Sequence, residues 1–294
     1  MSEVVVNKFL RKWGQFPDLA VKDAISRTFP DLYALTPPIN LGLLAEMRDV
    51  KTIRSVDLSF DGMISVHETG GYAIELNKSQ PTRRQRFTCA HEIGHTFFLE
   101  LESDELRPRM RVVDTNVELR TGSEEKLCNS IAAEILLPQI PFRRVVKEFG
   151  VCVANILSMA ELFHTSIQAT ARRLVECSRF KLAIALLEYN SDAELFATKW
   201  SVSSPSVKAR KSAISISKTD PAFHIFSQLN DRYRGRKWLS IGGGFDDYFV
   251  DAIVLKRTKP KQVLTLFVLE NNAEQLITTP LSPTNDLQIS LFDL

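Results

Sequence analysis

The sequence has no long apolar segment and no marked excess of charge of either sign. Its 294 residues contain no run of about 18 apolar residues, and the first residues lack the apolar core of a signal peptide. Lys and Arg number 37 against 35 Asp and Glu, a net charge of +2. We therefore expect no membrane association, and nothing in the overall charge demands a nucleic acid or an acidic membrane surface as partner.

Cysteine is also scarce. Cys89, Cys128, Cys152 and Cys177 are widely spaced and form no CxxC pair. A chain of this length with four scattered cysteines is typical of reduced thiols in the cytoplasm rather than of a disulfide framework. We interpret the four as small buried side chains and expect a cytoplasmic protein. Internal repeats and low-complexity tracts are absent.

The succession of patterns along the chain predicts an α+β protein in three parts, with boundaries at residues 141 and 180. In the first part, strands are predicted over 52–60, 63–68 and 72–77. Asp61-Gly62 and Gly70-Gly71 separate them, and both pairs are strong hairpin-turn signals. The sequence thus predicts a small antiparallel sheet, followed by helices over about 82–101 and 123–137.

The segment His91-Glu92-Ile93-Gly94-His95 carries the clearest chemistry. In a helix, residues i and i+4 lie on one face, so His91 and His95 can offer two imidazole nitrogens to one metal ion. Glu92 is placed to take the proton from a water molecule on that metal. A single inward histidine is more often a hydrogen-bonded core residue, but the pair with Glu92 favours a metal site. Gly94 is costly in a helix, which a close approach of another backbone or of the metal site would explain.

A catalytic zinc site usually has three protein ligands, so a third must come from elsewhere. His67, His164 and His224 have no motif around them and are better explained by surface or core packing. The helix over 123–137 carries three carboxylates. Glu134 lies nine residues from Glu125, on the opposite side at about 100° per residue, and Glu124 fits a capping box that begins at Thr121.

Glu125 is therefore the predicted third ligand, against the alternative of a solvated first-turn glutamate. Asn129, one turn further on, either orients Glu125 or a water molecule, or makes a helix-packing hydrogen bond.

These residues resemble the ImmA/IrrE metallopeptidases. The resemblance rests on Arg84 to His95, which follow an RxxFTxAHExGH-like pattern, and on Glu125 to Pro138, with E-x-x-x-N and an A-A-x-x-L-L-x-P ending. By this resemblance His91 and His95 correspond to the histidine ligands, Glu92 to the catalytic glutamate and Glu125 to the third ligand. It also implies Zn²⁺, or sometimes Mn²⁺, as the metal.

The resemblance further implies a zincin-like metallopeptidase domain over 1–141, a helical helix-turn-helix-like region over 142–180 and a GAF-like sensor or interaction domain over 181–294. In the last part, strand-like runs occupy 181–189, 252–257 and 263–270, and 201–211 is predicted to be a polar insertion. The expected substrate is an XRE-type helix-turn-helix repressor, cleaved in a stress, DNA-damage or mobile-element response. A small molecule or protein acting on the last domain is a possible activator.

A second hypothesis is a DNA-binding or sensor regulator with a structural metal site. It rests on the helical 142–177 segment and its basic residues, which are Arg143, Arg144, Lys147, Arg172 and Arg173. That density of charge is modest, and a solvated basic face explains it better than nucleic-acid binding. A third hypothesis is a peptidase kept inactive until its C-terminal domain receives a signal.

Overall fold

The computed structural model describes residues 2–106, 122–178, 180–205, 207, 215–218, 223–241, 244–256 and 260–269. The described chain forms two compact units. The first contains residues up to Phe142 together with Leu162–Thr165, and the second contains Arg143–Glu161 and the chain from Ser166 onward. The helical segment predicted over 142–180 is thus divided between the units, with most of it in the second.

The first unit begins with helices α1 (Ser2–Trp13) and α2 (Pro17–Thr28), a short 3-10 helix (Pro30–Ala34) and α3 (Leu41–Glu46). Pro17 lies at the first position of α2, where its missing N–H costs no hydrogen bond. The side chain of Asn40 caps α3 by accepting a hydrogen bond from Gly42 N at 3.0 Å.

A three-stranded sheet follows, formed by β1 (Val50–Val56), β2 (Gly62–Val66) and β3 (Tyr72–Asn77). Its order is β1-β3-β2, with β1 parallel to β3 and β2 antiparallel to β3. Gly70 and Gly71, both at positive φ, form the β2–β3 turn as predicted. The expectation of a wholly antiparallel sheet is wrong, because β3 pairs with both other strands and the Asp61-Gly62 pair does not close a hairpin between β1 and β2.

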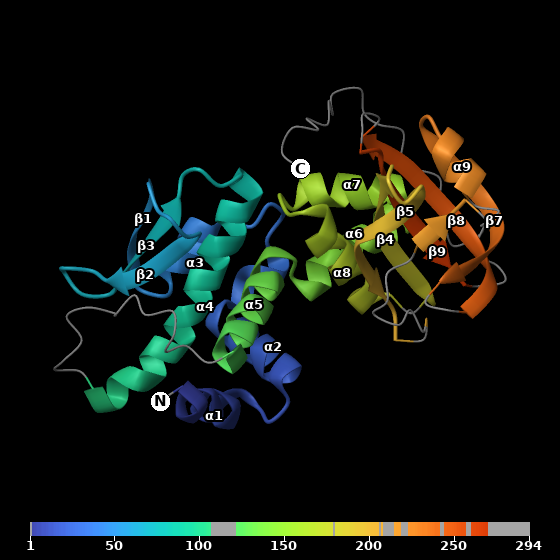
Figure 1. Cartoon of the computed structure of the whole chain (residues 1–294). Coiled ribbons are helices and arrows are strands. Elements are labelled where there is room, and N and C mark those ends of the chain that lie inside the picture. Colours follow the sequence, from blue (N-terminus) through green and yellow to red (C-terminus); the bar gives the residue numbers. More distant parts are fainter. Residues whose placement is uncertain are drawn as a thin grey trace. The chain divides into compact units, whose positions relative to one another are not determined.

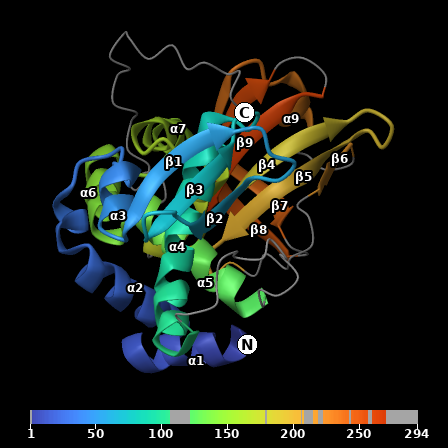
Figure 2. The same cartoon turned by 90° about the vertical axis from the view of Figure 1, so that its left-hand side faces the viewer.

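Helix α4 (Thr82–Leu106) is the 25-residue core helix of this unit. It packs against β2 and β3 on one side and against α1, α3 and α5 (Gly122–Leu136) on others, as Figures 1 and 2 show. Phe98 stacks on Phe9 of α1 with ring centroids 4.9 Å apart, and Phe97 meets Phe29 edge-on at 6.2 Å. Contacts on several sides hold α4 in one position, so the side chains it carries are rigidly placed.

In the second unit, α6 (Gln139–Phe149), which begins in the first unit, leads to α7 (Val153–Leu162) and α8 (Ile167–Cys177). Ser166 caps α8, its hydroxyl accepting a hydrogen bond from Ala169 N at 3.1 Å. Three consecutive short helices agree with the predicted helical character of this region. The helix-turn-helix assignment stays a prediction.

The rest of the second unit is a curled sheet with the strand order β6-β5-β4-β9-β8-β7 (Figure 1). Every described pairing in it is antiparallel. A short helix, α9 (Phe223–Gln228), packs near β5, and Phe226 lies in the core. The strands are β4 (Leu182–Asn190), β5 (Leu195–Ser203), β6 (Ser215–Ser217), β7 (Arg232–Ile241), β8 (Gly244–Lys256) and β9 (Gln262–Val268).

Sequence patterns identified β4, β8 and β9 but missed β5, β6 and β7. The predicted polar insertion is wrong over 201–203, which belong to β5. β5 mixes polar and apolar residues because parts of it are exposed, and β7, with the sequence RYRGRKWLSI, lies at the end of the described sheet. Edge strands commonly carry charge. The GAF-like assignment stays a prediction, and the tail predicted from Pro280 onward lies outside the described residues.

Asp251 of β8 links this sheet to α7. Its side chain is completely buried and pairs with Arg232 at 2.9 Å and with Arg234 at 3.5 Å. The same carboxylate accepts a hydrogen bond from Val153 N, at the start of α7, at 2.8 Å. A carboxylate at a helix N-terminus is favourable because the first N–H groups have no partner within the helix.

None of the helices in the described part of the chain combines the length and apolar character needed to cross a membrane.

Candidate metal centre

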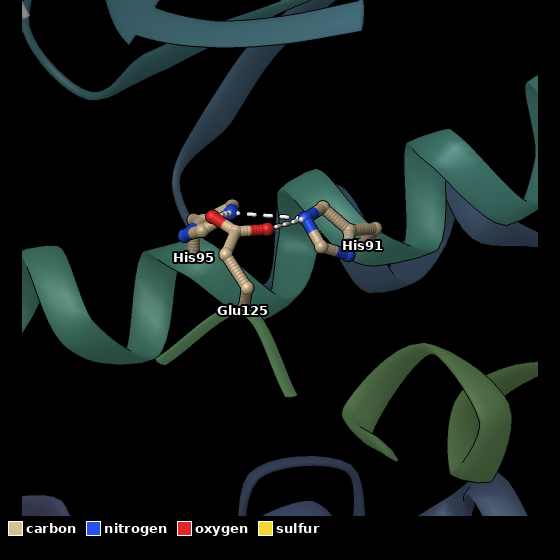
Figure 3. Close-up of side chains that lie close together, drawn as sticks. All are labelled: His91, His95 and Glu125. Atoms are coloured by element: carbon tan, nitrogen blue, oxygen red, sulfur yellow. Dashed lines mark hydrogen bonds and ion pairs between the residues drawn. The ribbon is translucent and has the colours of Figure 1, made fainter. Parts of the chain in front are cut away.

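Helix α4 brings His91 and His95 together on one face (Figure 3). Their Nε2 atoms are 3.1 Å apart, and the rings meet nearly perpendicular with centroids 4.8 Å apart. His95 is buried and His91 is partly exposed. The i,i+4 spacing therefore has the geometric result that the sequence predicted: two imidazole nitrogens converge on one point.

Glu125, in the first turn of α5, completes this cluster. One carboxylate oxygen lies 3.1 Å from His91 Nε2 and the other 3.4 Å from His95 Nε2. Hydrogen bonds from the two histidines hold the pKa of Glu125 well below its usual range, despite partial burial that opposes this. Burial alone would lower the pKa of His95, but interactions with Cys128, Glu124 and Glu125 raise it well above its ordinary value.

The three donors fit a divalent cation. Zn–N and Zn–O bonds of about 2.0–2.1 Å in a tetrahedral site place neighbouring ligand atoms about 3.3–3.4 Å apart. The observed separations of 3.1, 3.1 and 3.4 Å are close to this. Among the described residues, His91, His95 and Glu125 form one of two groups of at least three metal-binding side chains. Two imidazoles and a carboxylate suit zinc and leave room for a fourth ligand.

Glu92 follows His91 directly and is 96% buried, since its exposed fraction is 4%. Its Oε2 has no hydrogen-bond partner in the described part of the chain. A buried carboxylate oxygen left without a partner is costly. Such an oxygen is expected where a carboxylate must accept a proton from a bound molecule.

The geometry explains Gly94. A methyl group added there would lie 3.2 Å from Cys128 Cα and 3.3 Å from Cys128 O, both backbone atoms of α5. Glycine thus lets α5 approach α4 closely, as its presence in a helix suggested. This approach brings Glu125 within reach of the histidines.

Glu124 and Asn129 contact the ring nitrogens on the far side of the two histidines. Glu124 Oε1 lies 3.1 Å from His95 Nδ1, and Asn129 Oδ1 lies 3.1 Å from His91 Nδ1. Asn129 therefore contacts one of the two histidines. Cys128 Sγ is also 3.3 Å from His95 Nδ1, and His95, Glu124 and Cys128 form the second group of potential metal ligands.

The sequence analysis missed this role of Glu124, since it treated the residue as a helix cap. The capping box itself begins at Thr121, outside the described residues. A signal was present, because Glu124 continues the buried stripe of Cys128, Ile131 and Ile135 at spacings of 4, 7 and 11 residues. A carboxylate on such a stripe points into the protein and needs a polar partner there.

The remaining candidates belong to neither of the two groups of potential metal ligands. His67 Nδ1 contacts Thr69 in the β2–β3 turn, and His164 and His224 are exposed. Glu134 is buried and accepts a hydrogen bond from Gln139 N at 3.0 Å.

Comparison with known proteins gives one matching family. Residues 46–175 match the family described as the IrrE N-terminal-like domain, a peptidase family. The radiation response metalloprotease IrrE of Deinococcus radiodurans is 31% identical over 103 residues, which are 35% of this chain and 30% of that protein. The match thus spans less than a third of the relative's length.

A solved structure of a Mycobacterium tuberculosis transcriptional regulator aligns with a TM-score of 0.48 at 10% identity, over 94% of this chain and 97% of that chain. A likeness of this degree supports no conclusion about fold or function.

Proposed function

We propose that this chain, whose residues 46–175 match the IrrE N-terminal-like peptidase family, is a metal-dependent endopeptidase of the ImmA/IrrE type with a centre formed by His91, His95 and Glu125. The observation that carries this proposal is the convergence of three donor atoms, from two helices, at separations of 3.1–3.4 Å. Glu92 follows His91 in the chain, and its buried Oε2 has no hydrogen-bond partner among the described residues, so its carboxylate is the proposed proton acceptor.

The proposed reaction is hydrolysis of a peptide bond. A divalent cation at this centre, Zn²⁺ or alternatively Mn²⁺, would polarise the scissile carbonyl and lower the pKa of a water molecule. His91, His95 and Glu125 would hold the cation. Glu92 accepts the proton of the attacking water and later delivers it to the leaving nitrogen.

The test is the substitution Glu92→Gln. The variant is expected to retain bound metal, because Glu92 is not a ligand, and to lose proteolysis by about 10²–10⁴-fold, the usual contribution of a general base. Metal content is measured by elemental analysis and cleavage by mass spectrometry of the products. Near-normal proteolysis by the metal-loaded variant would contradict the role of Glu92.

The proposed substrate is a regulatory protein, in particular an XRE-type helix-turn-helix repressor. Its support is the resemblance to the family, together with a relative named as a radiation response metalloprotease. A stress or DNA-damage response is the corresponding context, and the cytoplasm the corresponding compartment. Four free cysteines agree with a reducing environment. Incubation of the zinc-loaded protein with such a repressor, beside the His91→Ala variant, tests this: cleavage only by the wild type is expected.

The second unit is proposed to receive a signal or to hold a protein partner. The predicted GAF-like domain over 181–294 and the helix-turn-helix-like region over 142–180 are its candidate sites. The observations that favour a DNA-binding regulator are weaker. Arg173, one of the five basic residues on the helical segment, is buried and paired with Glu176 at 3.4 Å. Duplex binding with a steep salt dependence would favour that alternative.

A further inference from the structure

The contact between Glu124 and His95 has a consequence for metal binding that the three ligands alone do not explain. We propose that Glu124 is a positioning residue: its carboxylate accepts the Nδ1–H of His95 and so holds the unprotonated Nε2 of that ring toward His91 and Glu125. This inference rests on the metal centre proposed above and extends it to a residue that touches neither metal nor substrate.

A histidine that binds a metal does so as a neutral imidazole, which has two possible tautomers. One ring nitrogen carries the proton and the other a lone pair, and only the lone pair can bind a metal. If Nε2 of His95 carried the proton, the lone pair of Nδ1 would face the Glu124 carboxylate oxygen at 3.1 Å. Two facing lone pairs repel, whereas Nδ1–H donating to a carboxylate is a strong, charge-assisted hydrogen bond. Glu124 therefore selects the tautomer that leaves Nε2 free.

Burial strengthens this selection. The side chain of His95 is 1% exposed and that of Glu124 is 10% exposed. Hydrogen bonds are electrostatically stronger in such a low-dielectric environment, and a misplaced proton is correspondingly more costly. Metal-bound histidines commonly donate their second N–H to a carboxylate in this way, which fixes the ring and increases the basicity of the ligand nitrogen.

Cys128 is the competing neighbour, since its Sγ lies 3.3 Å from the same Nδ1. A thiol sulfur is a weak acceptor compared with a carboxylate oxygen, so the N–H of His95 is directed to Glu124. The rival interpretation is that His95, Glu124 and Cys128 bind a second metal ion. The two interpretations predict different numbers of metal ions. If Glu124 accepts the N–H of His95, each chain binds one metal ion, whereas a second site at His95, Glu124 and Cys128 would give two.

Asn129 has the same relation to His91, but in a weaker form. Its Oδ1 lies 3.1 Å from His91 Nδ1, yet it is exposed and uncharged. Its contribution to metal affinity is therefore expected to be smaller than that of Glu124.

The experiment measures the zinc dissociation constant of the metal-free full-length protein against a competing chelator. Glu124→Leu removes the acceptor and is expected to weaken zinc binding roughly 10–100-fold, the usual effect of removing such a partner. Glu124→Gln keeps an acceptor oxygen and is expected to lie between wild type and Glu124→Leu; it also serves if the Leu variant does not fold. Histidine ring ¹⁵N spectra of the zinc-loaded protein are expected to show Nδ1 of His95 protonated.

Glu134→Gln is the matched control, because Glu134 is a buried carboxylate on the same helix that belongs to neither group of potential metal ligands. It is expected to lower the melting temperature of the metal-free protein without changing the zinc dissociation constant. Equal zinc affinity in wild type and Glu124→Gln, or equal losses in Glu124→Gln and Glu134→Gln, would overturn the proposal. Two zinc ions per chain, one lost in Cys128→Ser, would overturn it in favour of the second metal site.

The metal-binding measurements distinguish a failure of this inference from a failure of the proposed function. A wild-type protein that binds no metal at His91, His95 and Glu125 would remove both. A wild type that binds one zinc ion but does not respond to Glu124 substitution would remove only the positioning role. Zinc binding that depends on Glu124 supports the positioning role even if no peptide is cleaved.

Discussion

Glu125 lies where two helices contribute donor atoms to one point. Its two oxygens contact different histidines, so the loss of its charge affects both contacts together. Glu124 is the neighbouring residue in the chain and contacts the opposite nitrogen of His95. Two adjacent glutamates thus have different proposed tasks, one as ligand and one as positioning residue, because successive side chains of a helix differ in direction by about 100°.

Glu125→Gln is expected to reduce bound metal, because a neutral amide is a poorer ligand than a carboxylate. The measurement is the metal content of the purified protein after dialysis, with Glu134→Gln as the control that keeps its metal. Metal held as firmly by Glu125→Gln as by the wild type would mean that another carboxylate is the third ligand.

Asp251 is the residue expected to matter most for stability in the second unit. Asp251→Ala leaves Arg232 and Val153 N without their buried partner, and breaking a buried ion pair costs about 3–5 kcal/mol. Asp247→Ala is the control on the same strand, since its exposed pair with Arg236 is worth about 1 kcal/mol or less. Urea unfolding measures both. Similar losses for the two variants would contradict this assignment.

Among the elements, helices α4 and α5 supply the three donor atoms of the proposed metal centre. Gly94 allows the backbones of the two helices to approach each other closely. Both helices were predicted from sequence at nearly their observed positions, since capping and proline signals are local. β5 and β7 were not predicted, because their residues follow neither strict alternation nor an apolar run. Their strand conformation depends on pairing with β4 and β8, and such pairing is not encoded locally.

Gly94→Ala is expected to weaken metal binding by displacing α5. Alanine gains about 1 kcal/mol of helix propensity, but its methyl group meets the backbone of Cys128, and overpacking costs about 1–3 kcal/mol. Stability is therefore expected to change little while zinc affinity falls. Gly122→Ala, which adds a methyl group in open space at the start of α5, is the control. Unchanged zinc affinity in Gly94→Ala would show that α5 is not displaced.

On the scale of the whole molecule, the metal is expected to act as a stabilising ligand of the first unit. Binding to the folded state alone stabilises by RT ln(1 + [L]/Kd), about 2.7 kcal/mol at a hundredfold excess over Kd. Chelation should therefore lower the unfolding temperature of the wild type in calorimetry. His91→Ala should show no such shift, and an equal shift in both proteins would place the bound metal elsewhere.

The sequence by itself determined the pairing of His91 with His95 and the place of Glu92, because helical periodicity and i,i+4 spacing depend only on local backbone geometry. It also indicated the helix that supplies Glu125 as the third donor. Only the tertiary structure decided how α5 is rotated against α4, and with it that Glu124 contacts His95 Nδ1 while Asn129 contacts His91. Such a rotation depends on packing between residues about 30 positions apart, which no local pattern specifies.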